Sequence, residues 1–152
     1  DLRDHQTLCM AADELSQTGR ELYVEEMIQD PVFELLLGFS TDEQFGLIMT
    51  IATGGTMVEI FADSQTLLLP ASRTMIEKAL RNLKSGIFFD GFRGSPKADF
   101  DATVRTILAV QKFALESSRP LLELDINPLI IRPQGYGTIA ADALIKFANP
   151  QS

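Results

Sequence analysis

The sequence of 152 residues has one cysteine, Cys9, one histidine, His5, and no tryptophan. A single cysteine excludes an internal disulfide framework and a zinc site built from cysteines. One histidine leaves no Ser–His–Asp or Cys–His set for nucleophilic catalysis. The longest apolar runs are three leucines, far below the roughly 20 residues of a membrane span. Since the N-terminus does not resemble a signal peptide either, we expect a cytoplasmic protein with no membrane partner.

Positive charge is also scarce. Lysine and arginine number 13 and aspartate and glutamate 21, which gives a formal net charge of −8. A nucleic-acid-binding protein normally carries a basic stripe, so we expect no nucleic-acid partner. The composition, 45% hydrophobic and 22% charged, is that of an ordinary globular protein, and the length suits one domain with a real core. Because the first residue is Asp rather than Met, we expect residues 1–152 to be a single domain of a longer chain.

The first half of the sequence predicts one helix followed by strands. Apolar residues at helical spacing predict a helix over residues 6–17, which ends at Thr18 and Gly19. After it come short apolar runs that are bounded by turn residues. These runs predict four or five strands in a mainly antiparallel meander, over residues 22–24, 33–39, 45–51, 57–61 and 66–69.

The second half predicts two helices and then two strands. Ser72 is expected to cap a helix over residues 73–84, and Asp99 a longer one that reaches about Ser117. Strands are expected over residues 121–131 and 138–146, joined by a turn at 133–137. Because sheet and helices are segregated along the chain, the pattern predicts an α+β fold, a largely antiparallel sheet with helices packed on one face.

The strand expected over residues 121–131 has an unusual polar face. Successive side chains of a strand point to opposite faces, so Glu123, Asp125 and Asn127 share one face. The apolar neighbours on the opposite face are Leu122, Leu124 and Ile126.

A fourth polar group comes from the last strand. If the turn centres near residues 134 and 135, Asn127 lies opposite a position close to Asp142, an acid inside an apolar run. Oxygen-bearing side chains on adjacent strands can bind a hard cation, and a partial shell completed by substrate phosphates is typical of Mg²⁺. The alternative is a solvated strand face in which Asp142 bonds to a turn amide, since a buried acid needs some partner.

Two further features are candidate phosphate or partner contacts. Gly54 and Gly55 permit a close backbone approach or a positive φ, although any hairpin can contain such a pair. Arg93 lies between two glycines in an aromatic loop, where it can meet a phosphate or a partner protein. The alternative for Arg93 is a surface side chain that stacks on Phe92.

The residues Glu-Leu-Asp-Ile-Asn-Pro-Leu at 123–129, with Asp142 one hairpin later, resemble the closing motif of the ATP-grasp portion of NDP-forming acyl-CoA synthetases. These enzymes are relatives of the succinyl-CoA synthetase β chain, and some are fused to an acetyltransferase domain. The similarity runs from about Leu2 to Ile145, so this stretch is identified as the C-terminal ATP-grasp subdomain. The other matching stretches, in the family's order, are residues 24–28, 34–38, 42–46, 54–55, 58–59, 63, 70, 91–94 and 98–99.

The resemblance implies a Mg-nucleotide-binding part of an enzyme that interconverts acyl-CoA, ADP and phosphate with acid, CoA and ATP through a phosphohistidine. The Mg²⁺ would neutralise and orient the terminal phosphates of ATP or ADP. The implied metal ligands are Asp125, Asn127 and Asp142. The implied adenine contacts are Glu25, Met27 and Ile28, with Glu34 near the ribose.

The residues around the adenine contacts allow a partly independent argument. A strand with Glu25 and Met27 on one face offers a purine one polar and one soft apolar contact. An ordinary edge strand with an exposed glutamate is the alternative.

The family's preceding segment, with His-Lys-Ser-Asp and Gly-Gly motifs, is not in the sequence. The resemblance therefore implies no catalytic residue in this stretch, which would be inactive alone. The implied partners are the CoA-binding and phosphohistidine-bearing domains of the same chain or of a partner subunit, with CoA or acyl-CoA as substrate. An apolar face left uncovered by the missing segment also predicts self-association, so we expect an oligomer.

Three positions depart from the family pattern, which has a glycine at Ala52 and arginines at Leu67 and Leu144. Loss of two cations near a phosphate site leaves two alternatives open. One is a non-catalytic regulatory or structural ATP-grasp module of a protein acetyltransferase. The other is a different ATP-grasp ligase that joins a carboxylate to an amine.

Overall fold

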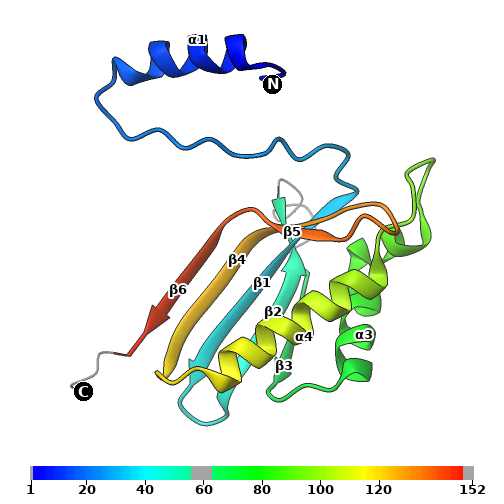
Figure 1. Ribbon diagram of the computed structural model, residues 1–152. Coiled ribbons are helices and arrows are strands. Elements are labelled where there is room, and N and C mark those ends of the chain that lie inside the picture. The colour runs from blue at the N-terminus through cyan, green and yellow to red at the C-terminus, as the bar shows by residue number, and fades with distance from the viewer. Residues whose placement is uncertain (1, 56–62, 149–152) are drawn as a thin grey trace.

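The computed structural model describes residues 2–55 and 63–148, and its centre is an antiparallel sheet of six strands (Figure 1). The strand order is β3-β2-β1-β4-β5, and β6 pairs with β4 beside β5. The predicted α+β fold is confirmed. The strands are β1 (Phe33–Asp42), β2 (Gly46–Thr53), β3 (Ser64–Leu68), β4 (Leu121–Ile131), β5 (Thr138–Ala140) and β6 (Ala143–Phe147), and the helices are α1 (His5–Ser16), α3 (Arg73–Asn82), the 3₁₀ helix η2 (Lys84–Asp90) and α4 (Phe100–Glu116).

The two helices α3 and α4 lie on the same face of the sheet (Figure 1). Alternate residues of β1 point to this face, and Leu35, Leu37 and Phe39 are almost fully buried there. The core is closed by apolar side chains of the other strands and of the two helices. Its other large members are Met49, Ile51, Ile76, Leu80, Val104, Ile107, Leu129 and Ile131.

Both predicted helix caps of this layer are present. The backbone N–H of Met75 donates to Ser72 Oγ at 3.3 Å, and that of Ala102 donates to Asp99 Oδ1 at 3.0 Å. A side-chain oxygen at the N-cap satisfies an N–H that has no partner within the helix. The helix predicted over residues 73–84 ends at Asn82, because η2 begins at Lys84.

The helix α1 is also where the sequence predicts it, but it stands away from the sheet (Figure 1). Asp4 caps it through a hydrogen bond of 2.8 Å from the N–H of Thr7. None of its residues is buried, and Cys9 is exposed. Among the described residues, no helix combines the length and the apolar content needed to cross a membrane.

Two strand predictions are wrong, and one cannot be compared. Residues 22–24 form no strand, because the segment from α1 to β1 is extended and has no partner strand within residues 2–55 and 63–148. The strand predicted over residues 138–146 is divided into β5 and β6 by Ala141 and Asp142. The strand predicted over residues 57–61 lies outside the described residues.

Candidate functional site

The face of the sheet opposite α3 and α4, called here the open face, carries the polar residues of the candidate site. Cross-strand partners in a sheet point to the same side, so the register of the strands defines this face. Gly38 pairs with Asp125, and Asp125 pairs with Leu144 on its other side. The residues of the open face are Glu34, Leu36, Gly38 and Ser40 on β1, Ile48, Thr50 and Ala52 on β2, Ser64, Thr66 and Leu68 on β3, Glu123 and Asp125 on β4, and Leu144 and Lys146 on β6.

Asp125 lies at the middle of this face beside a residue without a side chain. A Cβ added to Gly38 would lie 3.7 Å from Asp125 Oδ1, so glycine leaves the carboxylate accessible from this side. Burial, followed by the negative charges of Glu123 and Asp142, raises the pKa of Asp125 above its ordinary value.

Asp142 lies opposite Asn127 because of two matching irregularities, a bulge in β4 and the break between β5 and β6. The N–H of Asn127 donates to the carbonyl oxygen of Asp142 at 3.1 Å, so the predicted register of these two residues is confirmed. Leu129 pairs with Leu35 and Ile126 with Leu37, so two residues of β4 (Asn127 and Pro128) face the single residue Leu36 of β1, which defines a β-bulge. The break between β5 and β6 faces this bulge, since the N–H of Ala141 donates to the carbonyl oxygen of Pro128. The bulge explains why the last strand is divided.

Glu123 belongs to the same face but has its own partner. Lys146 Nζ lies 2.5 Å from Glu123 Oε2 across β6 and β4. The prediction that Leu122 lies with Leu124 on the buried face is wrong. A register shift near Leu122 leaves it 50% exposed and brings Leu121 into the core instead.

The donors at this point of the sheet are oxygen atoms, which suit a hard cation such as Mg²⁺. Asp125 and Asp142 supply carboxylates, and Asn127 is exposed and supplies an amide oxygen. Within the described ranges, no three His, Cys, Asp or Glu side chains are grouped so that they could hold a metal by themselves. The oxygen donors of Asp125, Asn127 and Asp142 match in type the predicted partial shell for Mg²⁺, which stays a prediction.

A cleft of about 330 Å³ lies at the Glu34 end of β1. Its walls are formed by the segment before β1, the end of β2 and the helix η2. The N–H of Gly54 donates to the carbonyl oxygen of Glu34 at 2.8 Å. The lining residues are Pro31, Val32, Phe33, Glu34, Thr53, Gly54, Gly55, Ser85 and Phe88.

Each of the two glycines meets one requirement that only glycine satisfies. A Cβ on Gly54 would lie 2.7 Å from the carbonyl carbon of Leu35, so the close backbone approach needs glycine. Gly55 has a φ of 64°, and a Cβ there would collide with the Glu34 carboxylate. The glycine pair therefore shapes the wall of the cleft next to Glu34.

The predicted adenine contacts lie on the extended segment before β1 rather than on a strand. Glu25 is exposed, Met27 is 57% exposed and Ile28 is half-buried. Met27 and Ile28 line a smaller cleft of about 210 Å³ together with Arg132 and Ile139. The expected strand is absent because this segment has no neighbouring strand that would accept its backbone hydrogen bonds.

Arg93 lies in the loop between η2 and α4, away from the strands that carry the acidic residues. Its side chain is exposed, and its Cζ atom is 5.2 Å from the centroid of the Phe92 ring. A φ of 48° places its backbone in the left-handed region.

The three positions that depart from the family pattern differ in their surroundings. Leu67 points to the helix side and packs against the core, whereas Ala52 lies on the open face opposite Leu36. Leu144 is 49% exposed and directly opposite Asp125. An apolar side chain therefore stands beside the carboxylate whose pKa is raised.

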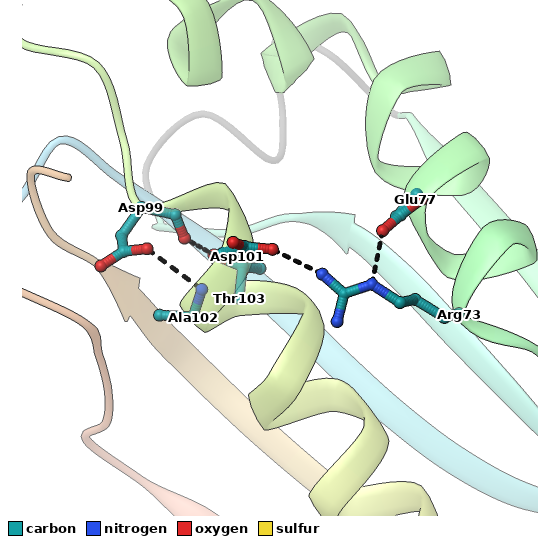
Figure 2. A network of polar contacts seen from close by, with 6 residues as sticks. All are labelled: Arg73, Glu77, Asp99, Asp101, Ala102 and Thr103. Carbon is teal, nitrogen blue, oxygen red and sulfur yellow. Dashed lines mark hydrogen bonds and ion pairs between the residues drawn. The ribbon is translucent and has the colours of Figure 1, made fainter. Parts of the chain in front are cut away.

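Asp99 has a role that its position as a helix cap does not reveal. Its carboxylate accepts hydrogen bonds from Ala102 N, at 3.0 Å, and from Gly135 N and Gly137 N, at 2.9 and 3.1 Å. The start of α4 is thereby tied to the turn between β4 and β5. Figure 2 shows the α4 side of this network, in which the Asp99 backbone oxygen also accepts from Thr103.

The second unpredicted residue is Arg132, at the end of β4. It lines the cleft that contains Met27 and Ile28, and its Nε atom is buried without a hydrogen-bond partner in the described part of the chain. A basic residue between Ile131 and Pro133 gives no pattern that sequence analysis can use. Only the fold brings it against the segment before β1.

Comparison with known proteins agrees with this fold and with the motif. A family model described as an ATP-grasp domain matches residues 5–147. An acetate–CoA ligase (ADP-forming) of Methanocaldococcus jannaschii is 32% identical over 136 residues, which are 90% of this chain and 19% of that protein. The β subunit of acetate–CoA ligase (ADP-forming) II of Pyrococcus furiosus is 30% identical over 115 residues, which are 76% of this chain and 49% of the subunit.

Solved structures give the same result. The dinucleotide-forming acetyl-coenzyme A synthetase 1 of Candidatus Korarchaeum cryptofilum, in complex with coenzyme A and Mg-AMPPCP, matches with a TM-score of 0.79 and 26% identity. The match covers 97% of this chain and 66% of that one. The chain thus spans about a fifth of the M. jannaschii relative and about half of the P. furiosus subunit. Because the family model and the fold agree over almost all of its residues, the chain belongs to the ATP-grasp domain family.

Proposed function

We propose that this domain binds the Mg²⁺ complex of ATP or ADP on its open face, as part of an ADP-forming acyl-CoA ligase. The parent reaction would interconvert acyl-CoA, ADP and phosphate with acid, CoA and ATP through a phosphohistidine. Three relatives or neighbours carry names of this chemistry, two as acetate–CoA ligases and one as a synthetase in complex with coenzyme A and Mg-AMPPCP.

The observation that carries the proposal is the strand register, which brings the backbones of three residues with oxygen-bearing side chains next to one another. Asp125 and Asn127 come from β4, and Asp142 from the break between β5 and β6 that faces the bulge. The raised pKa of Asp125 adds to this, because ionisable groups with shifted pKa values are concentrated at functional sites. A bound cation would balance the charge of these carboxylates. Such a partial oxygen shell suits Mg²⁺ that also binds phosphate oxygens.

In this proposal the chain's own residues orient the nucleotide. Mg²⁺ would neutralise and align the terminal phosphate oxygens. Asp125, Asn127 and Asp142 would hold the metal, and Gly38 keeps the surface beside Asp125 free for the phosphates. Glu34 would contact the ribose from its cleft.

The glycine pair and the hinge segment complete the proposed site. Gly54 and Gly55 would let the nucleotide approach the backbone beside Glu34, as a phosphate or ribose contact. The adenine edge would meet the backbone and side chains of Glu25, Met27 and Ile28. Arg93 is proposed as a contact for a phosphate or for the partner, on the exposed loop before α4.

The proposed partners are the CoA-binding and phosphohistidine-bearing domains, in the same chain or in another subunit. A separate β subunit among the relatives supports the second arrangement. We propose that the parent assembles as an oligomer in the cytoplasm. We further propose that the parent synthetase is of the kind fused to an acetyltransferase domain.

One observation favours a second function. Leu144 places an apolar side chain opposite Asp125, where the resemblance implies an arginine that would contact phosphate. A domain that still binds nucleotide but no longer transfers phosphate would serve as a regulatory module.

The test is calorimetry of ATP and ADP binding to the full-length protein, with and without Mg²⁺. Asp125→Ala and Asp142→Ala should each weaken Mg²⁺-dependent binding by about tenfold or more, because each loses a charged ligand. The matched control is Asp101→Ala, which removes an exposed carboxylate on the helix side of the sheet. Circular dichroism would show that each variant folds.

The outcomes separate the functions. Tight binding that neither substitution alters would refute the metal site. Metal-dependent binding together with ATP formation from acyl-CoA, ADP and phosphate would support the ligase. Metal-dependent binding without formation of ATP would support the regulatory module instead. In that case we expect Leu144→Arg to restore ATP formation.

A further inference from the structure

We propose that the outer edge of β6 pairs antiparallel with β6 of a second copy of this chain, so that the two sheets join into one. Among the described residues β6 has β4 as its only neighbouring strand, and it forms the outer margin of the sheet (Figure 1). An edge strand presents a row of unpaired N–H and C=O groups, and the partner that satisfies such a row is another strand. The pairing does not involve the proposed nucleotide site, and it gives the proposed oligomer a specific surface.

Two backbone hydrogen bonds determine which groups of β6 point outward. Just before β6, the N–H of Asn127 donates to the carbonyl oxygen of Asp142 at 3.1 Å. Just after it, the N–H of Ala148 donates to the carbonyl oxygen of Pro120 at 2.9 Å. In an antiparallel pair, successive residues direct their backbone groups alternately toward and away from the neighbouring strand. Since the even-numbered positions face β4, the residues that direct N–H and C=O to the free edge are Ala143, Ile145 and Phe147.

The side chains of β6 are apolar and accessible on both sides of the strand. Leu144, on the open face, is 49% exposed, and Ile145, on the helix side, is 43% exposed. The charge of Lys146 is balanced by its ion pair with Glu123. Unpaired charges and prolines are two of the features that normally protect an edge strand from another strand, and β6 has neither.

The other margins of the sheet differ from β6. At the opposite edge, β3 begins with the three polar residues Ser64, Gln65 and Thr66. On the same margin as β6, Ile139 of β5 lies in the cleft lined by the segment before β1. In the described part of the chain, β6 therefore combines an apolar composition with an accessible edge.

The sequence of β6 is complementary to itself when the second copy runs antiparallel. With Ile145 of one copy opposite Ile145 of the other, Ala143 lies opposite Phe147. In the same register, Leu144 lies opposite the methylene chain of Lys146. Every outward residue then exchanges backbone hydrogen bonds, and each cross-strand pair joins side chains that pack without a clash of like charges. The arrangement has two-fold symmetry and closes at two copies, so it leaves no free β6 edge.

The test is the mass of the full-length protein in sedimentation velocity, over a range of concentrations and without nucleotide. We expect a reversible dimer. Ile145→Pro should weaken dimerisation by about tenfold or more, because it removes the outward N–H in both copies and leaves the hydrogen bonds to β4 in place. Ile145→Lys should weaken it as well, since two positive charges would face each other across the two-fold axis. Circular dichroism would show that each variant folds.

The matched control is Leu68→Lys on the opposite edge strand. Leu68 is 52% exposed, so this substitution adds the same charge at an accessible apolar position away from β6. We expect it to dimerise like the parent protein.

A crosslink tests the register of the two strands. Opposite residues of a hydrogen-bonded pair have Cα atoms about 5.5 Å apart, within the range that a disulfide spans. In a background where Cys9 and the other accessible cysteines are replaced by serine, Ile145→Cys should form a disulfide between two copies on oxidation with copper phenanthroline. Leu68→Cys should form none under the same conditions.

Four results would overturn the proposal. They are a monomer at every concentration, a dimer that neither substitution of Ile145 weakens, an equal effect of Leu68→Lys, and no disulfide in Ile145→Cys. Asp125→Ala should leave the dimer intact, and Ile145→Lys should still bind nucleotide with Mg²⁺, because Ile145 lies on the side of the sheet opposite Asp125. Failure of the metal site and failure of the strand pairing are therefore distinguishable.

Discussion

Replacement of Asp99 by alanine should destabilise the domain far more than replacement of Asp101, two residues later on the same helix. Asp99 is only 7% exposed, and its carboxylate accepts three backbone N–H groups, from Ala102, Gly135 and Gly137. Loss of the helix cap costs about 1 kcal/mol. Each of the other two N–H groups adds about 1 kcal/mol, the typical net contribution of one hydrogen bond to the free energy of unfolding. The expected loss is about 3 kcal/mol.

For a domain of this size, that loss corresponds to a decrease in Tm of about 10 °C. Asp101 forms an exposed ion pair of 2.5 Å with Arg73, so Asp101→Ala should cost about 0.5 kcal/mol (Figure 2). The assay is chemical denaturation of both variants next to the parent chain. Equal losses for Asp99→Ala and Asp101→Ala would refute the assignment of Asp99 as the link between α4 and the turn.

The effect of Asp99 should also depend on pH. Burial acts to raise the pKa of Asp99, but the N–H groups of Ala102, Gly137 and Gly135, with the charge of Arg105, together lower it below its ordinary value. A carboxyl with a lowered pKa contributes stability above its unfolded pKa, and the contribution is lost as the pH falls through the folded value. The difference between Asp99→Ala and the parent should therefore be complete at pH 7 and smaller below the ordinary pKa of aspartate. A constant difference down to pH 2 would contradict the role of the charge.

Three further substitutions test the sheet. Gly54→Ala should cost about 2 kcal/mol in denaturation, because its Cβ would lie 2.7 Å from the carbonyl carbon of Leu35; an unchanged midpoint would show that the two strands adjust freely. Gly38→Ala should leave stability nearly unchanged, since the added Cβ has ordinary contacts, but should weaken Mg²⁺-dependent nucleotide binding in calorimetry by partly covering Asp125. Asp125→Asn should weaken that binding by about tenfold, because the amide lacks the charge of the carboxylate, and should stabilise the domain at pH 7 but not at pH 3, because a group with a raised pKa loses its favourable contribution as the pH rises. Equal stability of the two proteins at both pH values would contradict the raised pKa.

The elements that the sequence predicts correctly are those determined by residues close to one another in the chain. Ser72 and Asp99 cap helices through their own side chains, and β4 has the bounds that its apolar residues predict. The register of Asn127 and Asp142 was also predictable, because a hairpin with one turn fixes which residues face each other. Each of these features depends on residues close in sequence or joined by a single turn.

The remaining features depend on contacts that the sequence does not display. The run at residues 22–24 has the composition of a strand but no partner strand, and composition alone cannot supply one. Leu122 follows the expected alternation, and only the register shift exposes it. Arg132 lies beside Met27 and Ile28 because the fold brings the segment before β1 against the end of β4.

The isolation of α1 has a consequence for how the protein unfolds. None of its 12 residues is buried, and Leu8, Ala11 and Ala12 are half-buried only against the segment that follows the helix, so its helical state depends mainly on the Asp4 cap, backbone hydrogen bonds and intrinsic propensity. A water-exposed helix of that length is marginal by itself. Its amides should therefore exchange with solvent many orders of magnitude faster than those of β1 and β4, and a protease that cuts before β1 should release it without altering the melting of the sheet.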